Sequence, residues 1–143
     1  MEILQQSIQI HRTQHSRLSS IDFNHLEFGK HISDHMLVVD YADGKWGQPH
    51  IIPYGDMTLS PAMLSLHYGQ AIFEGMKAYK TTSGNITVFR LRRHYERMNR
   101  SLDRMCMPPI PYELFEQSLK ALIEVDRPWI PSAEGSSLYI RPV

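Results

Sequence analysis

The sequence predicts an α+β fold: a mostly antiparallel sheet with two main helices. The first observation is a series of short, strand-like runs joined by turns, as in residues 71–91, where AIFEGMKAY is followed by TTSGN and ITVFRL. The second is a set of apolar residues at helical spacing over 91–107. The third is another helical pattern over 112–125. Strands joined by tight turns pair antiparallel, so these segments predict a small sheet accompanied by two helices.

Composition places the chain among globular proteins and excludes several partners. Its 143 residues are 42% hydrophobic and 21% charged, and the fifteen basic residues balance the fifteen acidic ones. No large electrostatic field is therefore available to attract nucleic acid or an anionic membrane. The single cysteine, Cys106, cannot form an intrachain disulfide, and no apolar run is long enough for a membrane span. We expect a cytoplasmic protein.

The N-terminal part is expected to be a strand and a polar loop, residues 1–24, ahead of a small domain at 25–143. Ile8 and Ile10 alternate as in a strand, which argues against a transit peptide although acidic residues are few there. A hairpin is expected over 35–54, where HMLVVDY and PHIIPY flank the turn segment ADGKWG.

A short helix is expected before the second hairpin. Ser60 suits the N-cap, Pro61 suits the first helical position, and Gly69 can end the helix. In the strand that follows, Gly75 weakens strand formation, so it indicates a bulge or a group packed close against the backbone.

The helix expected at 91–107 carries two stripes, and Pro108 stops it. The apolar stripe consists of Leu91, Tyr95, Met98, Leu102 and Met105. The basic stripe consists of Arg93, Arg97, Arg100 and Arg104. A solvated face is the more frequent explanation of a basic stripe. The alternative is that one arginine binds an anion such as a cofactor phosphate, because the planar guanidinium matches phosphate oxygens in two-point contact.

The last segment, SLYIRPV at 137–143, is expected to be a strand. Alternation would place Tyr139 and Arg141 on one face, where a phenol beside a guanidinium can bind a carboxylate. A half-exposed edge strand explains the same pattern equally well. Because the sequence stops within an apolar, β-rich run, we expect the chain to be the front part of a larger protein.

The common catalytic sequence motifs are absent from the sequence. It has no G-x-G-x-x-G, no phosphate-binding glycine-rich loop, no C-x-x-C and no G-x-S-x-G. His31 and His35 are four residues apart, a spacing that suits a metal only on a helix, and the segment is typical of a loop entering a strand. No metal site is expected.

Several segments together resemble the branched-chain amino-acid aminotransferases, pyridoxal-phosphate enzymes of fold type IV. The matching segments occur in family order over nearly the whole chain: FGK at 28–30, SDHML at 33–37, LHYG at 66–69, FEGMKAY at 73–79, VFR at 88–90, R-M-x-R-S at 97–101 and SLYIRPV at 137–143. The resemblance implies the small N-terminal domain of such an enzyme. It also implies the cofactor pyridoxal 5'-phosphate and transfer of an amino group between leucine, isoleucine or valine and 2-oxoglutarate.

The resemblance assigns a cofactor residue and the distal-carboxylate residues. Arg97 matches the arginine that binds the cofactor phosphate. Tyr139 and Arg141 match a pair that meets the substrate, and Arg141 is the candidate for the distal carboxylate of glutamate or 2-oxoglutarate.

The resemblance also assigns aromatic pocket residues. Phe28 and Phe73 match aromatic residues that line the pocket for the branched side chain. Tyr68 matches a tyrosine that reaches into the neighbouring subunit's pocket, which implies a homodimer.

One departure from the family concerns catalysis. The family's Schiff-base lysine would lie beyond residue 143, in a larger second domain, and neither Lys77 nor Lys80 matches it. No catalytic residue is therefore assigned, and the chain alone is expected to be inactive. The alternative is a stand-alone, non-catalytic α+β module that binds an anion or a partner chain.

Overall fold

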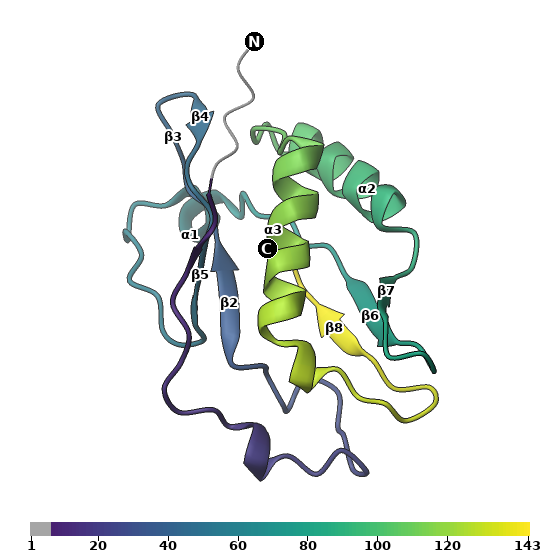
Figure 1. Ribbon diagram of the computed structural model, residues 1–143. Coiled ribbons are helices and arrows are strands. Elements are labelled where there is room, and N and C mark those ends of the chain that lie inside the picture. Colours follow the sequence, from purple (N-terminus) through teal and green to yellow (C-terminus); the bar gives the residue numbers. More distant parts are fainter. Residues whose placement is uncertain (1–6) are drawn as a thin grey trace. The chain divides into compact units, whose positions relative to one another are not determined.

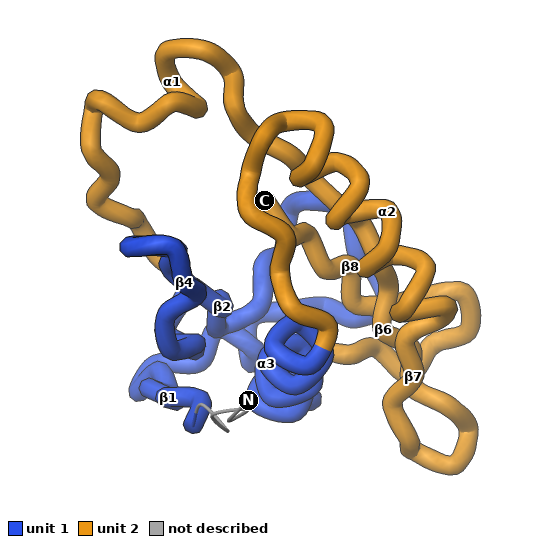
Figure 2. The backbone as a smooth tube through the Cα atoms, turned by 90° about the horizontal axis from the view of Figure 1, so that it is seen from above, with its two compact units in different colours: residues 1–54, 113–129 blue, residues 55–112, 130–143 orange. Residues whose placement is uncertain are grey.

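The computed structural model describes residues 7–143 and confirms a small α+β architecture with mostly antiparallel strands (Figure 1). The chain divides into two compact units (Figure 2). Unit 1 contains the chain up to Tyr54 together with Glu113–Trp129, and unit 2 contains Gly55–Tyr112 together with Ile130–Val143. The domain boundary expected near residue 24 stays a prediction.

Unit 1 contains a three-stranded sheet in the order β1-β5-β2. Strand β2 (His35–Val38) pairs antiparallel with β5 (His50–Pro53), and β1 (Gln9–Ile10) pairs parallel with the other edge of β5. The central strand supplies Ile51, which is fully buried. The polar loop between β1 and β2 contains the short 3-10 helix η1 (Leu18–Ser20).

A separate small hairpin lies between β2 and β5. Strands β3 (Tyr41–Ala42) and β4 (Lys45–Trp46) are joined by Asp43 and Gly44, whose φ angles of 53° and 76° suit a two-residue hairpin turn. The rings of Tyr41 and Trp46 meet edge to face across it, 5.2 Å between centroids. The expectation of one strand through Tyr41 was therefore wrong, because β2 ends at Val38 and this hairpin has its own two strands.

Helix α3 (Tyr112–Val125) has the bounds that its apolar spacing predicts. Phe115, Leu119 and Ile123 are buried, whereas Leu122, expected in the buried stripe, is only half-buried. The 3-10 helix η2 (Arg127–Trp129) follows it. Within unit 1 the end of α3 is joined to the start of β2 by Asp126, which accepts hydrogen bonds from the His35 backbone N–H and ring.

Unit 2 contains a second three-stranded antiparallel sheet, in the order β7-β6-β8. Its strands are β6 (Met76–Lys80), β7 (Ile86–Val88) and β8 (Leu138–Ile140). Met76 and Ala78 point to the buried face, whereas Lys77 on the alternate face is exposed. The central strand β6 begins at Met76 rather than at Ala71, so the segment around Gly75 leads into the sheet.

Helix α1 (Leu64–Tyr68) begins later than the sequence predicts. Ser60 is not its N-cap: the Ser60 hydroxyl accepts a hydrogen bond from the Ala62 N–H in the preceding turn, and Met63 occupies the cap position without a side-chain bond. The C-terminal expectation is confirmed, since Gly69 closes the helix in the left-handed conformation, φ 63°.

Helix α2 (Leu91–Arg104) ends three residues before its expected limit at 107. Cys106 adopts a left-handed φ of 53°, and the N–H groups of Cys106 and Met107 donate back to the carbonyls of Asp103 and Leu102. This pattern is a Schellman motif, which satisfies the last carbonyls of the helix. The helix is therefore ended by this turn before Pro108 is reached.

Candidate functional site

The four arginines of the basic stripe on α2 are all exposed, but only Arg97 of the four contacts a buried acid among the described residues. Its Nε donates to Glu74 Oε2 at 2.7 Å, and its Nη2 donates to Glu74 Oε1. Arg93 instead pairs with the neighbouring helix residue Glu96 at 3.0 Å. The helix thus presents one arginine held at two points, flanked by arginines that face solvent.

Glu74 is the buried member of this pair, with 2% of its surface exposed. Besides Arg97 it meets the Gly75 N–H, which donates at 2.7 Å, and His94 Nδ1, which lies 3.2 Å away. The hydrogen bonds from Arg97 lower the pKa of Glu74 to about 2, against the raising effect of its burial. The carboxylate is therefore ionised, and it raises the pKa of Arg97 in return.

The guanidinium of Arg97 keeps one edge available. Its side chain is 58% exposed, and its Nη1 donates no hydrogen bond to any residue within 7–143. A guanidinium fixed on one edge and open on the other is suited to one further anionic ligand. The phosphate group of pyridoxal phosphate fits this donor set.

Gly75 makes room for Tyr139. A Cβ atom built on Gly75 would lie 2.8 Å from Tyr139 Cζ and would also collide with the hydroxyl. Tyr139 is opposite Lys77 in the β6–β8 register, and its ring reaches along the sheet face over Gly75. The close approach indicated by a glycine at this position is thus to the ring of Tyr139.

Arg141 also contacts the side chain of Tyr139. Its Nη2 donates to the Tyr139 hydroxyl at 2.9 Å, and its guanidinium carbon lies 4.8 Å from the ring centroid of Phe73. Tyr139 also contributes to the raised pKa of Arg97, after the larger effects of Glu74. The structure therefore gathers Arg97, Tyr139, Arg141 and Phe73 in one region of unit 2.

The other two residues assigned by resemblance are exposed elsewhere. Tyr68, at the end of α1, is 83% exposed, and its ring lies 6.3 Å from that of His67. Phe28 is 79% exposed and belongs to unit 1. Their roles in substrate binding stay predictions.

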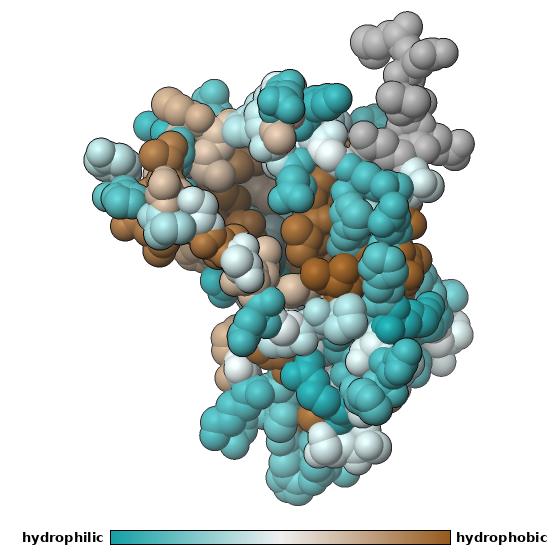
Figure 3. All heavy atoms as spheres, turned by 90° about the vertical axis from the view of Figure 1, so that its left-hand side faces the viewer, coloured by the Kyte–Doolittle hydropathy of each residue, from teal (hydrophilic) through white to brown (hydrophobic). Residues whose placement is uncertain are grey.

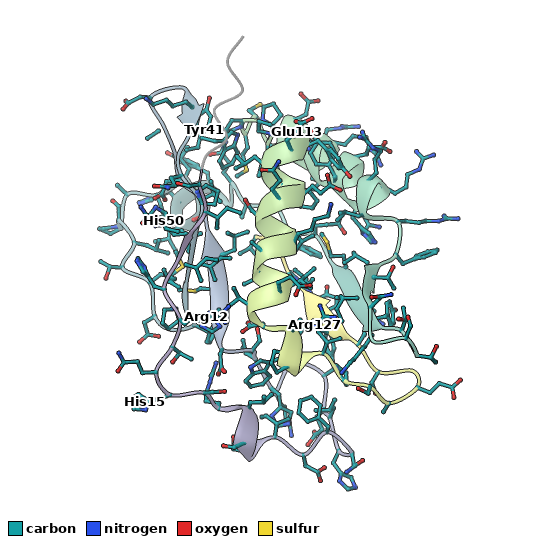
Figure 4. All side chains as sticks on the ribbon, viewed as in Figure 1. Arg12, His15, Tyr41, His50, Glu113 and Arg127 are labelled. Carbon is teal, nitrogen blue, oxygen red and sulfur yellow. The ribbon has the colours of Figure 1, made fainter. Side chains whose placement is uncertain are left out.

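A second polar cluster lies in unit 1, beside a cavity of about 190 Å³ that Arg12 also lines (labelled in Figure 4). His35 Nδ1 contacts Asp126 Oδ1 at 2.6 Å, and the ring's other nitrogen accepts the Thr13 N–H at 2.9 Å. Both ring nitrogens are therefore occupied, so His35 cannot serve as a general base. These two hydrogen bonds also give His35 a structural role that does not require a metal ion.

The neighbouring Asp34 is equally well satisfied. It accepts hydrogen bonds from the Ser16 hydroxyl, the Arg17 N–H and the Trp129 indole. Burial acts to raise the pKa of Asp34, but these hydrogen bonds and the charge of Arg17 lower it overall. We interpret this cluster as structural: its hydrogen bonds connect β2 to the end of α3.

Within residues 7–143 no group of three or more His, Cys, Asp or Glu side chains is arranged to hold a metal ion. The same part of the chain contains no helix that is both long and apolar enough to cross a membrane.

Sequence reasoning did not single out Glu74. The signal was present, because an acidic residue between Phe73 and Gly75 interrupts an otherwise apolar run that leads into a buried strand. A charge in such a position is retained only when it is paired. Its partner, however, is 23 residues away on a helix with several equivalent arginines.

No protein-family model matches the chain. Among curated proteins, branched-chain-amino-acid aminotransferase 2 of Bacillus subtilis (strain 168) is 48% identical over 122 residues, 85% of this chain and 34% of that protein. Branched-chain-amino-acid transaminase 1 of the same strain is 46% identical over 122 residues, with the same coverage. The branched-chain-amino-acid aminotransferase of Mycolicibacterium smegmatis is 46% identical over 117 residues, 80% of this chain and 32% of that protein. The chain therefore spans about a third of the length of these relatives.

Proposed function

Since this chain is related over 85% of its length to branched-chain-amino-acid aminotransferases, about a third of whose length it spans, we propose that it is the N-terminal portion of such an enzyme. The reaction moves an amino group between leucine, isoleucine or valine and 2-oxoglutarate. The cofactor is pyridoxal 5'-phosphate, and the complete protein is a cytoplasmic homodimer. The sequence relationship is the observation that carries this proposal.

The arrangement of unit 2 supports roles for its residues. Arg97 binds the cofactor phosphate through its open Nη1 edge. Arg141 receives the distal carboxylate of glutamate or 2-oxoglutarate, with its guanidinium held against Tyr139 and Phe73. Phe73 and Phe28 supply apolar surface for a branched side chain. Bound pyridoxal phosphate supplies the electron sink that amino transfer requires.

Exposed apolar side chains support the homodimer. Within residues 57–68 of unit 2, five such residues expose more than half of their surface: Met57, Leu59, Leu64, Leu66 and Tyr68. Hydrophobic atoms are visible on the face shown in Figure 3. A contiguous exposed apolar patch is typical of surfaces that bind other proteins. In the proposed dimer Tyr68 reaches the pocket of the second subunit.

The 143-residue chain does not carry the chemistry alone. Lys77 and Lys80 lie on the exposed side and at the end of β6, and neither is at the family position of the cofactor-linked lysine. We therefore expect turnover only from the full-length protein.

The test is amino transfer by the full-length protein with pyridoxal phosphate. Leucine and 2-oxoglutarate are expected to yield glutamate and 4-methyl-2-oxopentanoate in equal amounts, measured by chromatography. Aspartate in place of leucine is the control donor. It is expected to react more slowly because its side-chain carboxylate is one methylene closer to the α-carbon than that of glutamate, so it falls short of Arg141 and is left poorly paired. Absence of glutamate, or a faster reaction with aspartate, would contradict the proposal.

A further inference from the structure

We propose that Glu74 is a positioning residue for Arg97: it holds two of the guanidinium nitrogens so that the third, Nη1, is presented to one phosphate group. The proposal rests on the function proposed above and identifies a residue to which the sequence resemblance assigned no role.

The geometry of the pair fixes the guanidinium plane. Arg97 donates from Nε to Glu74 Oε2 at 2.7 Å and from Nη2 to Oε1. Two parallel hydrogen bonds to one carboxylate leave the planar group little freedom to rotate. An exposed arginine without such a partner samples many rotamers and loses that freedom only when a ligand binds.

Glu74 is itself fixed by the backbone around it. Its N–H donates to the Pro142 carbonyl at 3.0 Å, which joins this segment to the chain just after β8. The Gly75 N–H donates to Glu74 Oε1 at 2.7 Å, so the backbone holds one of the two oxygens that accept from Arg97. The position of Arg97 is thereby set by the chain around β6 and β8 rather than by α2 alone.

His94 completes the contact from one turn earlier on α2. Its Nδ1 lies 3.2 Å from Glu74 Oε1 and 3.3 Å from Arg97 Nη2. When protonated, this nitrogen donates to the carboxylate, and when unprotonated, it accepts from Arg97. Either form leaves Nη1 of Arg97 open.

Positioning and simple electrostatics make opposite predictions for Glu74. A buried negative charge beside a phosphate site repels the phosphate, so electrostatics alone predicts that Glu74→Gln binds phosphate more tightly. If Glu74 acts by orienting Arg97, the same change weakens phosphate binding. Glu74→Asp separates the two further, because it retains the charge but is one methylene too short to keep both contacts.

The experiment measures dissociation constants of pyridoxal 5'-phosphate and of pyridoxal, which lacks the phosphate, for the full-length protein by fluorescence quenching. Glu74→Gln and Glu74→Asp are each expected to weaken binding of the phosphorylated form by roughly tenfold, with little change for pyridoxal. Glu96→Gln is the matched control, because it also removes one negative charge, but from a residue of α2 that pairs with Arg93. It is expected to change neither of the two dissociation constants. Arg97→Ala gives the size of the whole phosphate contribution.

A further variant keeps the test decisive if the Glu74 variants unfold. Arg97→Lys retains the positive charge and a partner for Glu74. An ammonium group, however, has a single nitrogen, whereas the planar guanidinium can be held by Glu74 at two nitrogens while its third nitrogen binds a ligand. We expect it to lose affinity for the phosphorylated form about as strongly as Glu74→Asp. Binding like that of the wild type would show that a point charge suffices and would overturn the proposal.

The outcomes separate this inference from the proposed function. If Arg97→Ala weakens binding while folded Glu74→Gln and Glu74→Asp bind as tightly as the wild type or more tightly, only the positioning role fails. If the wild-type protein binds the two forms equally, no phosphate site exists at Arg97, and the cofactor assignment and the inference fail together.

Discussion

Among the described residues, the neighbours of the Arg141 guanidinium are aromatic side chains, and none is an acidic counter-ion. It lies 4.8 Å from the Phe73 ring centroid and 5.2 Å from that of Tyr139, and it donates to the Tyr139 hydroxyl. An arginine stacked in this way keeps its positive charge available for a ligand. These contacts suit a residue that binds a substrate carboxylate.

We predict that Arg141→Gln separates the two substrate classes of the full-length enzyme. The distal carboxylate of glutamate loses its charged partner, whereas an aliphatic side chain loses little. Leaving a buried carboxylate poorly paired costs about 2–5 kcal/mol, so kcat/KM should fall roughly tenfold or more further for glutamate than for leucine. The measurement is the half-reaction with each amino acid, followed through the cofactor absorbance.

Lys80→Gln is the control for Arg141→Gln, since it removes an exposed positive charge from the end of the same sheet. It is expected to affect neither substrate. Equal losses for leucine and glutamate in Arg141→Gln would show that Arg141 supports the pocket or the cofactor, and its role as the carboxylate-binding residue would be dropped.

Just before β6, Gly75 leaves the space that the ring of Tyr139 on β8 occupies. No Cβ can be accommodated there without moving Tyr139, and Gly75 has no left-handed φ that would explain the glycine otherwise. We predict that Gly75→Ala destabilises the full-length protein by about 1–3 kcal/mol, as overpacking does. Chemical denaturation measures this change.

Gly55→Ala is the matched control, because a Cβ at Gly55 meets nothing within 4 Å and its φ is not left-handed. It is expected to change the unfolding free energy little. In a Tyr139→Ala background the cost of Gly75→Ala should largely disappear. Equal destabilisation by the two glycine substitutions, or no relief in the Tyr139→Ala background, would mean that Tyr139 does not set the requirement for glycine.

Among the elements, those defined by a strong apolar period were predictable, whereas ends set by backbone caps were predictable only where a glycine marks them, as Gly69 does for α1. The bounds of α3 follow its apolar spacing, and α2 starts where its stripe starts. The end of α2 depends on Cys106 in a left-handed conformation, which a non-glycine residue seldom adopts. The β3–β4 hairpin was missed because its two-residue strands are too short to show alternation.

The site was predictable in part for a related reason. Strand alternation predicted that Tyr139 and Arg141 share a face, and in the structure their side chains are hydrogen-bonded. Spacing alone left the arginines of α2 equivalent, and Arg97 was distinguished by family resemblance. The buried partner Glu74 makes the physical difference, and a contact across 23 residues leaves no periodic signal in the sequence.

At the scale of the whole molecule, segments far apart in the sequence contribute to one region of unit 2. Residues 73–75 lead into β6, Arg97 comes from α2, and residues 139–141 come from β8 and the chain after it. The central claim, that this region binds a cofactor phosphate, can be tested through Arg97.

The most direct measurement is the affinity of the full-length protein for pyridoxal 5'-phosphate in three variants, Arg97→Ala, Arg93→Ala and Arg104→Ala. Each removes one exposed arginine from α2, but only Arg97 is held by Glu74. A charge-assisted contact contributes about 1.5–3 kcal/mol, so Arg97→Ala should weaken binding roughly tenfold or more while the other two change it little. Equal losses in all three variants would show that the stripe acts only as a diffuse positive field, which would contradict the assignment of the phosphate site to Arg97.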